Sequence, residues 1–274
     1  TCVITNIGTC HLENLGDRDG VLKAKTEIFQ SMKPNGHIVL NGDDDKLITV
    51  REYNGVKPVF FGLNSERDVY ADQIESKGLK GVACRIHLGE DAFDVLVPTP
   101  GIHMVYNALA AAAVGRIYGL TIEEIRRGIE SLETIRGRFK MIETDKFLVV
   151  DDCYNANPMS MKASLDVLHD GEGRRVAILG DMGELGEDEA ALHEGVGIHA
   201  ATCGIDACVC VGDLAVHIAE AARKANPDFP VYYEKTRESL LEHLNDYVQK
   251  GDTILVKASH FMKFEEVVKA LEEM

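Results

Sequence analysis

The chain has 274 residues, a formal net charge of −16 and 45% hydrophobic residues. This length and hydrophobic content allow one large domain or two ordinary ones. The negative charge argues against duplex nucleic acid as a partner, because such binding depends on neutralising phosphates with Lys and Arg. No apolar run approaches the roughly 20 residues of a membrane span, and no signal peptide is visible.

Strand-like and helix-like segments alternate along the chain. We expect strands over 2–6, 37–41 and 58–61, antiparallel strands between 68 and 97, and further strands over 147–150, 175–179, 207–211, 231–233 and 253–256. Helices are expected over 18–32, 44–53, 106–118, 122–132, 159–168, 187–201, 214–225, 238–249 and 264–273, with Thr121 and Glu124 as a capping box. This alternation predicts an α/β fold with mostly parallel sheets and helices on both faces. We place the domain boundary near Phe139.

The seven cysteines include no Cys-x-x-Cys pair, which argues against a zinc site. Cys208 and Cys210 alternate within an apolar run and should lie on one face of a strand. We expect reduced, mostly buried thiols of a cytosolic protein.

A first candidate site follows the first predicted strand. His11 and Glu13 come after that strand and should point toward the ligand edge of the sheet. Imidazole is a common metal ligand and a carboxylate suits Mg²⁺, although a loop histidine bonded to a backbone carbonyl is the alternative. Lys25 borders the apolar side of the next helix, whereas Lys23 reads as an ordinary solvated position.

Two further segments carry candidate nucleotide contacts. Asn107 lies near a helix start in the segment 100–110, where a capping amide is the alternative interpretation. Gly137-Arg138-Phe139 is a short loop whose arginine could reach phosphate oxygens. His193 and His199 are interpreted as surface positions of a helix.

The octet 151–158, Asp-Asp-Cys-Tyr-Asn-Ala-Asn-Pro, is the most informative segment. It joins a predicted buried strand to a predicted helix. Open α/β sheets bind ligands at the carboxyl ends of their strands, and helix N-termini favour phosphate. We therefore favour a ligand site over the alternative, an Asx-rich turn in which Asn157 caps the helix.

The octet closely resembles a signature of the Mur ligases, a family of bacterial cell-wall enzymes, and the resemblance covers nearly the whole chain. It implies a truncated central ATPase domain over 1–139, with a mostly parallel sheet plus antiparallel strands, and a Rossmann-like C-terminal domain over 140–274. The implied reaction is ATP-dependent amide ligation through an acyl phosphate. The form of the octet favours the member that adds D-alanyl-D-alanine to a UDP-linked muramoyl tripeptide.

The resemblance also assigns roles to residues of this chain. His11 and Lys25, fourteen residues apart, would hold Mg²⁺ once CO₂ has carbamylated the lysine, a reaction that needs a desolvated amine. Nucleotide contacts would come from Asn107 at the adenine, Arg138 at the phosphates and Asp152 at the ribose, with Tyr154, Asn155 and Asn157 lining the nucleotide and acceptor region. Acceptor contacts from Ser259 or His260 are implied too, but Met104, Ala258 and His260-Phe261 depart from the usual pattern of Asn, Gly and Arg-Gly.

No Gly-x-x-x-x-Gly-Lys-Ser/Thr phosphate loop occurs in the chain. In the Mur ligases this loop lies upstream of the segment that begins here. We therefore expect a fragment with little or no ligase activity alone, and self-association through the truncated sheet edge. A folylpolyglutamate-type ligase and a non-catalytic nucleotide-binding module are the other hypotheses.

Overall fold

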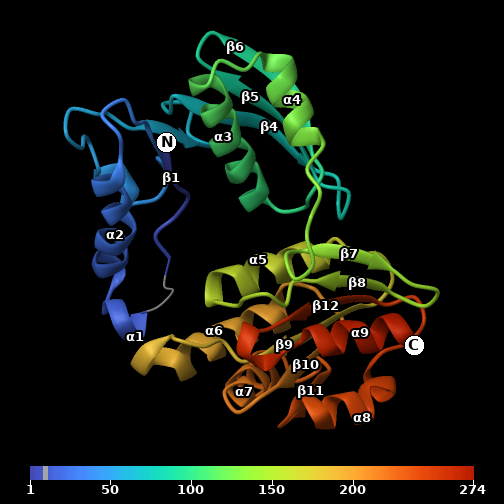
Figure 1. The fold of residues 1–274 in the computed structure, drawn as a ribbon. Helices are drawn as coiled ribbons and strands as arrows, with labels where there is room; N and C mark the ends of the chain where they lie inside the picture. Colours follow the sequence, from blue (N-terminus) through green and yellow to red (C-terminus); the bar gives the residue numbers. More distant parts are fainter. Residues whose placement is uncertain (9–11) are drawn as a thin grey trace. The chain divides into compact units, whose positions relative to one another are not determined.

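The computed structural model describes residues 1–8 and 12–274, which form two compact units, Thr1–Glu133 and Thr134–Met274 (Figure 1). The units divide earlier than Phe139. Gly137 N donates to Asp151 Oδ2 and Phe139 N donates to Asp152 Oδ1, and these bonds tie the preceding loop to the second unit. Within the described ranges, every helix is too short or too polar to cross a membrane.

The first unit is built on a six-stranded sheet whose spatial order follows the chain. The strands are β1 (Cys2–Ile4), β2 (Ile38–Asn41), β3 (Val59–Gly62), β4 (Val69–Ser76), β5 (Val82–Leu88) and β6 (Asp91–Val97). The strands β1 to β4 pair in parallel, and β5 pairs antiparallel with both β4 and β6. The expected combination of parallel and antiparallel strands is confirmed.

Helices cover the two faces of this sheet unequally. Those of the first unit are α1 (Leu12–Leu15), α2 (Arg18–Thr26), continued by a 3₁₀ helix (Glu27–Ser31), α3 (Ile102–Ile117) and α4 (Ile122–Glu130). The helices α3 and α4 pack on the buried face of β2 to β6, whereas α2 and the 3₁₀ helix pack with β1 and β2 in a separate cluster. The capping box of Thr121 and Glu124 is confirmed at the start of α4.

The helix predicted over 44–53 is wrong. The segment contains only a 3₁₀ turn, Leu47–Thr49. The Asp44 carboxylate accepts hydrogen bonds from the backbone N of Lys46 and Leu47, and also from Ile7 N. Such local side-chain bonds offer the backbone an alternative to a regular helix.

The second unit holds a six-stranded sheet in the order β11-β10-β9-β12-β8-β7. Its strands are β7 (Lys140–Glu143), β8 (Leu148–Asp151), β9 (Arg175–Gly180), β10 (Ala207–Val211), β11 (Val231–Glu234) and β12 (Thr253–Lys257). Only the β7–β8 pair is antiparallel. The strand β7 was not predicted, because a four-residue edge strand with charged residues at both ends lacks a clear apolar alternation.

Helices cover both faces of this second sheet, as expected (Figure 1). They are α5 (Pro158–His169), α6 (Glu189–Thr202), α7 (Ala215–Ala225), α8 (Arg237–Tyr247) and α9 (Glu265–Glu273). Burial on both faces explains why the central strands are apolar throughout. Cys208 and Cys210 lie fully buried on one face of β10 with their sulfurs 3.6 Å apart, which confirms their predicted placement.

Candidate active site

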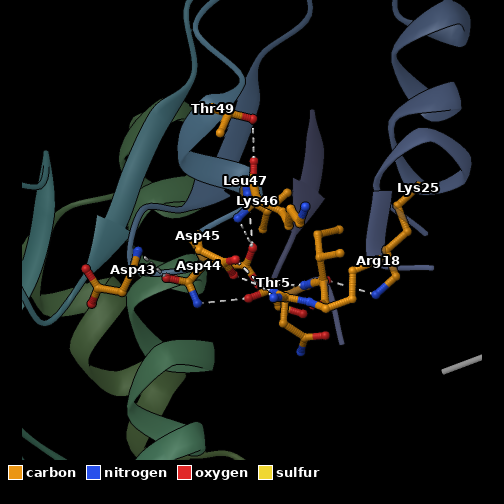
Figure 2. A network of polar contacts seen from close by, with 12 residues as sticks. Thr5, Arg18, Lys25, Asp43, Asp44, Asp45, Lys46, Leu47 and Thr49 are labelled. Carbon is orange, nitrogen blue, oxygen red and sulfur yellow. Dashed lines mark hydrogen bonds and ion pairs between the residues drawn. The ribbon is translucent and has the colours of Figure 1, made fainter. Parts of the chain in front are cut away.

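In the first unit, Lys25 carries its amine to the carboxyl end of β1 (Figure 2). Its Nζ donates a 2.9 Å hydrogen bond to the carbonyl oxygen of Asn6, two residues past the strand. The residue is exposed, whereas carbamylation by CO₂ would need a desolvated amine. Position and hydrogen bond nevertheless place a primary amine at the sheet edge where α/β proteins bind ligands.

The predicted partner of Lys25 cannot be placed, because His11 lies outside the described residues. Glu13 lies in α1. Within residues 1–8 and 12–274, no cluster of three or more His, Cys, Asp or Glu side chains is arranged to hold a metal ion. An ammonium group has no lone pair to offer a cation, so Lys25 would fit Mg²⁺ only after conversion to a carbamate.

Two acidic residues that follow β2, Asp44 and Asp45, bond the backbone and the Arg18 side chain (Figure 2). Asp44 is nearly buried and accepts from Ile7 N at 2.7 Å and from the backbone N of Lys46 and Leu47 at 3.0 Å. Arg18 donates from Nε to the Ile7 carbonyl at 2.9 Å and pairs through its guanidinium with Asp45. These bonds fix the chain just past β1, and sequence reasoning did not identify them.

Asn107 lies in the second turn of α3 and is exposed. The helix begins at Ile102, after Gly101, so the alternative of a capping amide is wrong. Its Nδ2 donates only a 3.4 Å bond to Met104 Sδ. It borders a groove of about 450 Å³ between α3 and α4 whose walls are mainly apolar, including Val97, Ala108, Ala111, Leu120, Ile125, Ile129 and Leu132.

The first aspartate of the octet is structural. Asp151 ends β8, is buried, and accepts from Gly137 N at 2.8 Å and from Cys153 Sγ at 3.0 Å. Burial and this bond to Asp151 raise the pKa of the Cys153 thiol. Gly137 has a φ of 76°, a left-handed conformation that favours glycine, and a Cβ there would lie 3.1 Å from Tyr154 Cβ, which is a tight contact.

The second aspartate, Asp152, accepts three hydrogen bonds. Phe139 N donates to Oδ1 at 3.1 Å, while Ser164 Oγ and Lys257 Nζ donate to Oδ2 at 2.7 and 2.6 Å. The Lys257 side chain is only 3% exposed and also donates to the Asn155 carbonyl at 3.0 Å. A carboxylate offers about four lone-pair sites, so Oδ1 keeps room for one more donor.

The loop arginine stacks on the octet tyrosine. The guanidinium carbon of Arg138 lies 4.1 Å from the centroid of the Tyr154 ring, within cation–π range. The ring of His260 meets Tyr154 edge to face at 5.7 Å between centroids. Arg138, Tyr154 and His260 are all exposed, so the structure brings a cation and two aromatic rings together on the surface beside Asp152.

The octet amides behave differently from each other. Asn157 caps α5, since its side chain accepts from Ser160 N at 2.9 Å. The capping interpretation of this residue is therefore confirmed. Asn155 is exposed, and its Oδ1 accepts from Ala156 N.

Ser259, implied to contact the acceptor, is hydrogen-bonded to the loop 181–183 that follows β9. Ser259 Oγ accepts from Gly183 N at 2.9 Å, and Ser259 N donates to the Asp181 carbonyl at 3.0 Å. Asp181 Oδ1 accepts from Leu214 N and Ala215 N at the start of α7. Burial raises the pKa of Asp181. Ser259 is therefore buried and holds the turn after β9 through these hydrogen bonds, whereas His260 is exposed.

The interpretation of His193 as a surface residue is wrong. The ring is fully buried, accepts from Met182 N through Nε2 at 2.9 Å and donates from Nδ1 to the Glu189 carbonyl at 2.7 Å. His199 is half-buried and bonds Asp166 at 2.6 Å. Spacings of three and four residues from Val196 and Gly197, both buried, were the available signal for His193.

The free energy of unfolding should decrease as the pH is lowered, because of His193. Burial lowers its pKa below the ordinary value of 6.5. As pH falls, the unfolded chain therefore binds the proton first, so the stabilisation is complete above about pH 6.5 and is lost below it. The loss should approach about 1.4 kcal/mol per pH unit.

Urea unfolding measures this loss of stability. It should be followed for the wild type and for His193→Gln between pH 7.5 and 5.5, roughly one unit either side of the ordinary pKa. The variant should show a smaller decline in the free energy of unfolding. Equal declines in the two proteins would show that His193 does not contribute.

Comparisons with known proteins agree with this architecture. The model of the Mur ligase middle domain matches residues 1–115, and that of the Mur ligase glutamate ligase domain matches residues 137–260. Two similar relatives are the UDP-N-acetylmuramoyl-tripeptide–D-alanyl-D-alanine ligases of Bacillus subtilis and Escherichia coli, each 35% identical over 99% of this chain. The chain spans 59% and 60% of their lengths.

Solved structures show the same relationship. MurF from Acinetobacter baumannii superposes with a TM-score of 0.89 at 32% identity, covering 99% of this chain and 59% of that one. MurF ligase from Thermotoga maritima in complex with ADP gives 0.83 at 26% identity, covering 99% and 61%. With middle-domain and ligase-domain models matching successive parts of one sequence, and with these relatives matching nearly all of it, the chain belongs to the Mur ligase family.

Proposed function

We propose that this chain provides the ATP-binding and acceptor-binding parts of a ligase that adds D-alanyl-D-alanine to a UDP-linked muramoyl tripeptide. In this proposal residues 1–139 belong to the central domain and residues 140–274 form the C-terminal domain. The observation that carries it is the cluster of Arg138, Asp152 and Tyr154 at the carboxyl end of β8. The similarity to ligases of this specificity supports the choice of substrates.

The proposed reaction has two steps. The terminal carboxylate of the tripeptide attacks the γ-phosphorus of ATP, and ADP leaves, giving an acyl phosphate. The amine of D-alanyl-D-alanine then attacks the acyl carbon, loses a proton and expels phosphate as the amide forms. Positioning and neutralisation of charge supply most of the acceleration in such reactions.

The described residues suit their proposed nucleotide contacts. Arg138 is exposed, so its guanidinium can bind phosphate oxygens. Asp152 Oδ1 has room for a ribose hydroxyl, and the Asn107 amide lies beside an apolar groove that suits a purine ring. Within the second unit, Tyr154, Asn155 and Asn157 would line the region beside Asp152.

Mg²⁺ would be held by His11 and by Lys25 in its carbamylated form, whose oxygens suit a hard cation. Such an ion would neutralise phosphate charge during transfer. The position of the Lys25 amine at the end of β1 supports its part in this site.

A substrate panel tests the proposed activity. Phosphate release should be measured with the natural protein that contains this chain, given ATP, Mg²⁺ and the UDP-muramoyl tripeptide with D-alanyl-D-alanine. A folate with glutamate replaces those two substrates in the second arm. We expect release only with the first pair. Release only with folate and glutamate would instead identify a folylpolyglutamate-type ligase, and calorimetric ATP binding without release in either arm would indicate a binding module.

We also infer self-association through β1. In the described part of the chain β1 pairs only with β2, and Val3 is 38% exposed. A groove of about 430 Å³ lies beside Val3 and is lined by Ala110, Ala111, Val114, Tyr118 and Leu120. Unpaired strand edges promote association.

The free cysteines of the described residues support a further proposal, a reducing, cytoplasmic location.

Val3→Lys should weaken this association, because a charge on an edge strand opposes edge-to-edge pairing. Sedimentation over a range of concentrations should show a lower average mass for the variant than for the wild type. Ile135→Lys removes another exposed apolar side chain, from the second unit, and serves as the control. Equal masses for all three proteins would contradict the inference.

A further inference from the structure

The segment Lys257-Ala258-Ser259 connects two polar loops of the second unit. It leaves the carboxyl end of β12, which lies between β9 and β8 in the sheet. One end of the segment bonds the octet that follows β8, and the other bonds the loop that follows β9. Neither the reaction chemistry nor the nucleotide contacts described above make use of Lys257.

The Lys257 ammonium binds groups of the protein itself and is not exposed to bind a ligand. Its ammonium is 2.6 Å from Asp152 Oδ2 and 3.0 Å from the Asn155 carbonyl. The Asp152 side chain is 15% exposed and that of Lys257 3%, so the lysine lies behind the carboxylate. A buried ammonium must be paired to be tolerated, and these contacts therefore determine the orientation of the carboxylate and the turn at Asn155.

Ser259 acts similarly on the neighbouring loop. It is 5% exposed, its Oγ accepts from Gly183 N, and its own N–H donates to the Asp181 carbonyl. Two residues along the chain thus fix two loops that follow different strands. The lysine belongs to the proposed nucleotide side and the serine to the proposed acceptor side.

We propose that Lys257 is a positioning residue for the nucleotide site, acting through Asp152, and that Ser259 is its counterpart for acceptor binding, acting through the loop 181–183 that follows β9. This rests on the proposed ligase function. The amine of Lys257 is too buried to meet a substrate, but it holds the carboxylate whose Oδ1 stays available. Removing Lys257 should therefore weaken nucleotide binding, whereas removing the Ser259 hydroxyl should weaken acceptor binding.

The amide hydrogen exchange of the chain tests the positioning without any assay of activity. Lys257→Met should speed exchange locally over 137–139 and 152–156. The matched control is Arg174→Met, which removes the cation beside Asp252, a carboxylate 1% exposed at the amino end of β12. The proposal fails if Lys257→Met leaves these two segments as protected from exchange as in the wild type. It also fails if Arg174→Met speeds exchange in the same two segments by the same amount.

Steady-state kinetics of the natural protein test the consequence. Lys257→Met should raise KM for ATP by roughly tenfold or more, the effect of one charge-assisted hydrogen bond, with a smaller change in kcat. Ser259→Ala should raise KM for D-alanyl-D-alanine and leave KM for ATP unchanged. Arg174→Met should change neither. The reverse assignment of the two KM effects would overturn the proposal.

A comparison of two other variants covers the case in which Lys257→Met does not fold. The pair Asp152→Asn with Lys257→Met removes both charges and leaves no buried ion. Its KM for ATP should equal that of Asp152→Asn alone, because Lys257 acts through Asp152; a further large rise would refute this. If Lys257→Met speeds exchange locally as expected but the natural protein shows no ligase turnover, the positioning role of Lys257 stands. Only the proposed ligase function is then rejected.

Discussion

Lys25→Ala is expected to abolish the proposed ligase turnover of the natural protein that contains this chain, lowering kcat by about a thousandfold or more. Only a carbamate at this position would give the proposed Mg²⁺ an oxygen ligand, and alanine cannot form one. The amine lies at the carboxyl end of β1 and donates to the Asn6 carbonyl, which supports the proposed role. Initial rates of phosphate release with saturating substrates measure the effect.

Two controls separate this role from a general effect of the helix. Lys23 is an exposed lysine of the same helix, and Lys23→Ala should keep nearly full activity. Added formate, acetate or propionate should partly restore Lys25→Ala, because a short carboxylate can take the place of the carbamate oxygens. Full activity of Lys25→Ala would exclude the lysine from catalysis.

Asp152→Ala is expected to reduce the free energy of unfolding by about 3–5 kcal/mol, because it leaves the Lys257 ammonium buried without a counter-charge. It should also remove ATP binding, since the ribose contact is assigned to this carboxylate. Urea unfolding and calorimetric titration with ATP and Mg²⁺ measure the two effects.

The two effects of Asp152→Ala should separate in a second variant. Adding Lys257→Met to Asp152→Ala removes the unpaired charge and should recover much of the stability without restoring ATP binding. Asp145→Ala, at an exposed aspartate between β7 and β8, should be neutral in both measurements. If Asp152→Ala loses no stability, the ion pair with Lys257 contributes little.

The apolar runs of the sequence were sufficient to predict most of the sheets. The run 207–211 is β10 itself, and the runs at 147–150 and 253–256 differ from β8 and β12 by single residues at their ends. Strands covered on both faces must be apolar at every position, which makes them easy to recognise. The segment 44–53 was misassigned because Asp44 binds backbone groups that the pattern of apolar residues does not reveal.

The sequence by itself determined the family, the α/β class and the location of the octet between a buried strand and a helix, because composition, periodicity and motif are local properties of the chain. Only the tertiary structure decided that Asp152 is held by Lys257, 105 residues away, and that His193 is buried. Parallel strands bring together segments that are distant along the chain, and the pairing of a buried charge depends on which strand ends meet. No local pattern contains that information.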